Sequence, residues 1–74
     1  MTDLFDEMAQ AWGTSVVTRS ELKKFSGGIL NPRTIANLDS MGIGISNRFR
    51  CGKHVVYPVT DVVQFLRERA REVE

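Results

Sequence analysis

Two stretches decide the fold: Asn31–Gly42, NPRTIANLDSMG, and Arg48–Pro58, RFRCGKHVVYP. The first predicts a short helix over 32–41, because asparagine is a strong N-cap and proline is favoured at the first helical position. The second predicts a two-stranded hairpin over 46–57. Its expected turn is Cys51-Gly52, since glycine suits the positive φ of tight hairpin turns.

Apolar spacing and capping residues predict three further helices. Thr18 and Glu21 form a capping-box pattern before the second of these helices, and Thr60 is the expected N-cap of the last. Val16 and Val17, a β-branched pair, indicate a short strand. The three helices are expected near residues 3–12, 19–26 and 60–71.

The apolar residues of the central part of the chain predict which side chains form the core. In the proline-initiated helix, we expect Ile35, Leu38 and Met41 to face inward. Ile29 and Leu30 precede this helix and are expected to anchor the connection to the core. A chain of 74 residues buries only about 60% of its unfolded surface, so little room remains for an enclosed substrate pocket.

Composition is that of a globular domain, with 42% apolar and 26% charged residues. Cys51 is the only cysteine, which excludes an internal disulfide and fits a reducing, cytoplasmic location. No apolar run approaches the roughly 18 residues that span a membrane. We divide the chain into an acidic N-terminal helix or extension, residues 1–15, and a main domain, residues 16–74.

Charge is distributed unevenly, although the formal net charge is only +1. Residues 1–15 carry three acidic side chains and no Lys or Arg. Residues 19–54 carry seven Lys and Arg against two acidic residues, a net charge of +5. Such a concentration is the electrostatic footprint expected of a nucleic-acid-binding surface.

The proline-initiated helix is the candidate recognition element. Arg33 has the geometry to bind guanine, Asn37 to pair with adenine, and Thr34 to contact a thymine methyl or a phosphate. Asn31 can help to hold a phosphate at the first turn. The alternative is an ordinary solvated helix face, with Asn31 acting only as a cap.

Cations of the hairpin and of the preceding helix complete the predicted interface. Around the hairpin tip these are Arg48, Arg50, Lys53 and His54, which suit phosphate contacts or insertion into the minor groove. On the preceding helix, backbone contacts are expected from Arg19, Lys23 and Lys24. The alternative for the hairpin is a charged edge that prevents aggregation. A helix able to enter a DNA groove beside a basic hairpin is the layout of a small winged helix-turn-helix, an α+β fold.

Catalytic and metal-binding arrangements are absent from the pattern. His54 has no cysteine or carboxylate at ligand spacing, and no Ser, His and Asp suggest a triad. Gly27-Gly28 lacks the lysine of a phosphate-binding loop. We therefore expect no enzyme activity, no metal, no cofactor and no small-molecule substrate.

The order of these motifs resembles the excisionase-like and MerR-like small winged-helix domains. The resemblance covers about residues 16–69 and rests on Val17–Leu22, Pro32–Ile35, the basic hairpin ending in Tyr57-Pro58, and Asp61–Leu66. It implies a double-stranded DNA binder whose second helix enters the major groove while the hairpin reaches a neighbouring groove. The resemblance also implies two kinds of partner, an integrase or further copies of the chain bound to the same DNA.

Sequence-specific binding of double-stranded DNA is thus the expected function. The expected role is an excisionase-like recombination directionality factor or a small phage or mobile-element transcription regulator. The alternative is a protein-interaction module without DNA binding. In that case the acidic helix near 3–12 docks on a partner and the basic face meets an acidic protein.

Overall fold

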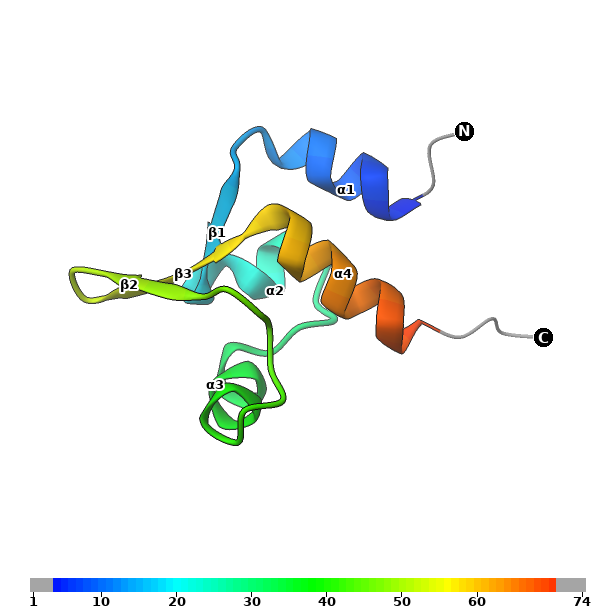
Figure 1. The fold of residues 1–74 in the computed structure, drawn as a ribbon. Helices are drawn as coiled ribbons and strands as arrows, with labels where there is room; N and C mark the ends of the chain where they lie inside the picture. The colour runs from blue at the N-terminus through cyan, green and yellow to red at the C-terminus, as the bar shows by residue number, and fades with distance from the viewer. Residues whose placement is uncertain (1–3, 71–74) are drawn as a thin grey trace.

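The computed structural model describes residues 4–70 and contains a three-stranded antiparallel sheet. The strands of this sheet are β1 (Val16–Thr18), β2 (Phe49–Cys51) and β3 (His54–Pro58), in the order β1-β3-β2. The β2–β3 hairpin projects outward at the left of Figure 1. Strand β3 pairs with both others, so Val17 lies opposite Tyr57 and Phe49 lies opposite Val56. The short strand expected at Val16-Val17 is therefore present as β1.

Four α-helices are found within the described residues. They are α1 (Leu4–Trp12), α2 (Leu22–Phe25), α3 (Pro32–Ser40) and α4 (Val59–Arg69), with a 3-10 turn η1 (Arg19–Glu21) directly before α2. The α+β prediction is thereby confirmed. The expected helix start at residue 3 lies outside the described residues, whereas the last helix ends at Arg69, two residues earlier than predicted, because Ala70 already has an extended backbone. No helix within 4–70 combines the length and the apolar character that a bilayer crossing requires.

The core gathers side chains from the sheet and from helices α2 to α4. Tyr57 of β3 is fully buried at its centre, together with Leu22 of α2 and Val62 of α4. Helix α1 packs beside α4 and contributes a half-buried apolar side to this core. The ring of Trp12 stands edge-on to that of Phe25, with 5.3 Å between their centroids. The apolar side of α1 is thus partly covered by the chain itself, whereas Leu4 at its start is 67% exposed.

Helix ends follow the predicted signals at α3 and depart from them elsewhere. The side chain of Asn31 accepts a hydrogen bond from the Arg33 amide at 2.9 Å, which confirms it as the N-cap of α3. Thr18 makes no hydrogen bond to the backbone of the following turn, so the predicted capping box is wrong. Its hydroxyl instead donates to the Glu21 carboxylate at 2.9 Å. The expected Thr60 cap is also wrong, because α4 already begins at Val59 with Pro58 preceding it.

Gly42 ends α3 in a Schellman motif. The Gly42 amide donates to the Asp39 carbonyl, and the Ile43 amide donates to the Leu38 carbonyl. Gly42 has a φ of +78°, the left-handed conformation that this motif requires at that position. The helix therefore ends at Ser40, one residue earlier than predicted, and the chain turns away towards the hairpin.

Two apolar residues lie outside the core that the sequence predicted for them. Met41 is 62% exposed because α3 has already ended there, so the buried positions of the helix are Ile35 and Asp39. Ile29 is 72% exposed and is not part of the core cluster, since it directly follows the Gly27-Gly28 turn. Its neighbour Leu30, at 5% exposure, alone provides the expected anchor of this connection.

The hairpin is shorter than predicted and its turn falls one residue later. The last paired residues are Cys51 and His54, so the turn consists of Gly52 and Lys53. Gly52 has a φ of +61° whereas Lys53 does not adopt positive φ, the pattern of a type II′ turn. Residues 46–48 form a loop rather than a strand.

Gly44 is required for a close approach between two parts of the backbone. A Cβ at this position would overlap the Asp39 Oδ1 atom and would lie 2.8 Å from the Asp39 backbone nitrogen. Because one of these neighbours is backbone of α3, it cannot move aside cheaply. The loop 43–48 is thus held directly against α3.

Replacing Gly44 with alanine should lower the free energy of unfolding by about 1–3 kcal/mol, the usual cost of overpacking a rigid site. Urea denaturation followed by the fluorescence of Trp12 measures this change. Gly27→Ala is a matched control for the close approach, because a Cβ there meets nothing within 4 Å and only its φ of +68° is strained. A loss for Gly44→Ala no larger than for this control would contradict the close approach.

Candidate nucleic-acid interface

A buried carboxylate connects α3 to the sheet behind the basic surface. The side chain of Asp39 is only 3% exposed. Its Oδ2 atom accepts from the Tyr57 hydroxyl at 2.5 Å and from the Arg19 guanidinium at 3.0 Å, while Oδ1 accepts from the Ile45 amide at 3.1 Å. Arg19 also donates to the Tyr57 oxygen at 2.9 Å, which closes a triangle of three side chains.

This triangle changes the acid–base behaviour of two of its members. Burial, followed by the hydrogen bond to Asp39, raises the pKa of Tyr57 to about 12. Burial opposes the charge of Arg19, but hydrogen bonds to Tyr57 and Asp39 outweigh it and raise the pKa of the guanidinium further. At neutral pH the triangle therefore contains a neutral phenol and a cationic guanidinium.

Titration of the chain's only tyrosine tests this arrangement. Tyrosinate absorbance should develop around pH 12 in the folded protein and around pH 10 in denaturant. Because the folded state raises this pKa, the stabilisation is complete below about pH 10 and is lost as the pH rises through about 12. Alkaline unfolding should therefore accompany the ionisation. A folded-state midpoint near pH 10 would mean that the phenol is not engaged as the structure shows.

Arg48 is drawn into the same region rather than into the hairpin. Its guanidinium donates to the backbone carbonyls of Asp39 at 3.0 Å and Ile45 at 3.3 Å, and lies 3.9 Å from the Asp39 carboxylate. These contacts tie the loop before β2 to the C-terminal end of α3. Arg19 and Arg48 thus both serve the internal structure, which the charge pattern alone did not indicate.

One concavity, here called the cationic groove, brings together three separate segments of the chain. It has a volume of about 330 Å³ and lies between η1, the first turn of α3 and the β2–β3 hairpin. None of the described residues that line it is acidic. They are Arg19, Ser20, Pro32, Arg50, Lys53, His54 and Val55.

The hairpin supplies most of this charge because of its register. Arg50 lies opposite Val55, so both side chains stand on the same face of the sheet as Tyr57, two residues further along β3. Lys53 belongs to the turn itself. The side chains of Arg50, Lys53 and His54 are all exposed. Three of the four predicted hairpin residues therefore gather at one groove, and Arg48 is the one that does not.

The predicted recognition residues divide between two sides of α3. Arg33 and Asn37 are four residues apart, exposed, and therefore on one outward face next to the groove-lining Pro32. Thr34 lines a different, apolar concavity together with Asn31. The side-chain oxygen of Asn31 is already used by the helix cap. Lys23 and Lys24 of α2 are exposed, and neither lines the cationic groove.

No protein-family model, curated protein or solved structure matches this chain. Its function is therefore inferred from the geometry of the described residues. Within these, no group of three or more His, Cys, Asp or Glu is placed to hold a metal ion. Cys51 is a free, exposed thiol at the end of β2, as expected from its place near the hairpin tip.

Asp39 and its partners are the structural residues that sequence reasoning missed. The available signal was its position, four residues after the inward-facing Ile35 on the same helix face. A carboxylate at such a position predicts a buried ion pair, since an unpaired charge there would be very costly. Its partners come from residues 19 and 57, and no local pattern connects these.

Proposed function

We propose that this chain is a small winged helix-turn-helix domain that binds double-stranded DNA. The observation that carries the proposal is the cationic groove, in which the exposed hairpin side chains of Arg50, Lys53 and His54 lie beside Arg19 and the first residue of α3, and none of the described lining residues is acidic. A phosphate backbone is the natural ligand for such a surface, because cations that neutralise phosphates gain free energy from counterion release. The order helix, strand, two helices and hairpin, with the sheet order β1-β3-β2, also supports this proposal.

In the proposed complex, α3 enters the major groove and the β2–β3 hairpin follows the adjacent backbone. Arg33 and Asn37 face the base edges, where arginine reads guanine and asparagine reads adenine. Arg50, Lys53 and His54 hold phosphates, while Arg19 adds charge at the groove without leaving its contacts to Asp39 and Tyr57. The proposed biological role is that of an excisionase-like directionality factor or a small transcription regulator.

The packing of α1 argues against the rival protein-interaction module. Phe5, Met8 and Trp12, the apolar residues that would dock on a partner, are already packed against the core of the chain itself. Of the apolar residues of α1, Leu4 is the one that stays largely exposed, at 67%. The DNA proposal uses surfaces that the fold leaves exposed.

Amide NMR with isotope-labelled protein and a short generic duplex tests the proposal. We expect chemical-shift changes over residues 31–37 and 50–54 that weaken strongly between low and moderate salt. Residues 59–69 of α4 serve as the internal reference, because none of them lines the cationic groove. The absence of shifts at low salt would overturn the proposal. Shifts confined to α1 would favour the protein-interaction alternative.

A further inference from the structure

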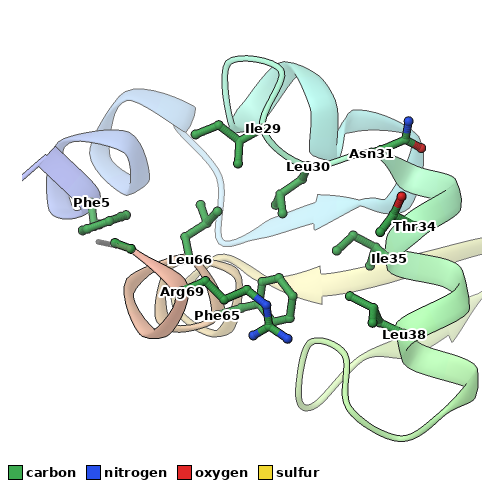
Figure 2. A pocket seen from close by; sticks show the side chains of 11 residues that line it. Phe5, Ile29, Leu30, Asn31, Thr34, Ile35, Leu38, Phe65, Leu66 and Arg69 are labelled. Atoms are coloured by element: carbon green, nitrogen blue, oxygen red, sulfur yellow. The ribbon is translucent and has the colours of Figure 1, made fainter. Parts of the chain in front are cut away.

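A second groove on the molecule is apolar and lies on the other side of α3 from Pro32. It has a volume of about 330 Å³ and is formed by α1, the α2–α3 connection, α3 and α4 (Figure 2). Leu30, Ile35, Phe65 and Leu66 form its floor and are each at most 6% exposed. Ile29, at 72% exposure, lies at its rim, so the groove explains where this unexpectedly exposed side chain points.

Among the described residues that line this groove, Arg69 is the only cation and none is acidic. The guanidinium carbon of Arg69 lies 3.8 Å from the centre of the Phe65 ring, a cation–π contact that holds it beside the apolar floor (Figure 2). Within residues 4–70, Arg69 has no carboxylate partner. Arg67 on the same helix is different, because it forms an ion pair with Asp6 at 3.4 Å.

The dimensions of the groove favour a small ligand over a protein. Its volume falls at the lower end of the roughly 300–1,000 Å³ typical of small-molecule sites. A specific protein interface would have to bury about 1,000 Å² or more, but the floor residues are already almost covered. An apolar floor with one unpaired guanidinium at its edge is complementary to an apolar chain that ends in a single anionic group.

We propose that this apolar groove binds a monocarboxylate with an apolar tail, such as a medium-chain fatty acid. The tail lies on the floor formed by α3 and α4, and the carboxylate pairs with the guanidinium of Arg69. An arginine–carboxylate pair is a charge-assisted hydrogen bond, stronger than a contact between neutral groups. This site does not require DNA binding, so its test does not depend on the DNA-binding proposal.

Amide NMR titrations with octanoate and 1-octanol, which share a tail but differ in charge, test this site. We expect both probes to shift the amides of Ile29, Thr34, Leu38 and Ala70, and octanoate to bind about tenfold more tightly. Arg69→Gln should remove the advantage of octanoate while octanol still binds, which shows that the groove remains folded. Arg33→Gln, which removes an exposed cation that does not line this groove, is the matched control and should retain the full difference.

Three results would overturn the proposal. The first is the absence of shifts at the groove with either probe, and the second is an equal preference for octanoate in the wild type and in Arg69→Gln. The third is a change of the groove amides with protein concentration alone, together with a dimer in sedimentation. That result would mean that a second copy of the chain, rather than a small acid, covers the groove.

Discussion

Replacing Asp39 with alanine should lower the free energy of unfolding by about 3 kcal/mol. Breaking a buried ion pair by removing one partner costs about 3–5 kcal/mol. The lower end applies here because the Arg19 side chain is 29% exposed, so water can partly solvate its charge once Asp39 is removed. The change also leaves the Tyr57 hydroxyl and the Ile45 amide without their acceptor. Since a domain of this size has only about 3–5 kcal/mol of stability, about 0–2 kcal/mol should remain, and a measurable fraction of the variant, up to about half, should be unfolded at room temperature.

Urea denaturation followed by Trp12 fluorescence measures the loss, and two further variants locate its cause. Asp6→Ala removes a carboxylate from the exposed ion pair with Arg67 and should cost less than about 1 kcal/mol. Asp39→Asn keeps the shape of the side chain, but its amide NH₂ group would face groups that are themselves hydrogen-bond donors. It should therefore recover little of the lost stability. Equal losses for Asp6→Ala and Asp39→Ala would show that Asp39 contributes no more than a surface charge.

The order of the elements could be predicted from the sequence because its signals are local. Asn31-Pro32 specifies a helix start and Gly42 a helix end through the conformations of a few adjacent residues. The same holds for a hairpin between two β-rich runs with a glycine in its turn. Local signals also brought Arg50, Lys53 and His54 to one hairpin tip, since residues so close in sequence cannot separate.

The parts that were mispredicted depend on residues distant in sequence. Arg19 and Arg48 were predicted to be surface cations because no residue next to either of them in the sequence indicates a contact with Asp39. Asp39 lies 20 residues from Arg19 and 9 residues from Arg48. The position of the hairpin turn depends on how β3 pairs with β1 as well as with β2, so a one-residue error was not visible locally. Likewise, the exposure of Met41 follows from the point at which α3 ends, not from apolar spacing.

The double variant Arg50→Gln, Lys53→Gln should weaken binding to any duplex by about 50-fold near 0.1 M salt, if both side chains neutralise phosphates. Each lost phosphate contact removes about 0.9 from the slope of log affinity against log salt concentration, so the slope should fall by about 1.8. Both side chains are exposed and belong to the hairpin, so the fold should tolerate the change. Fluorescence anisotropy of a labelled duplex at several salt concentrations measures both quantities.

The matched control is Arg67→Gln, Arg69→Gln, which removes the same charge from the far end of α4, away from the hairpin (Figure 1). If the cationic groove is the DNA-binding surface, this control should keep most of the affinity and nearly the full salt slope. Equal losses in the two double variants would mean that net charge alone attracts DNA, without a defined face. A hairpin variant that binds as tightly as the wild type would remove the groove from the interface, because a surface that releases counterions cannot lose two cations without a change in salt dependence.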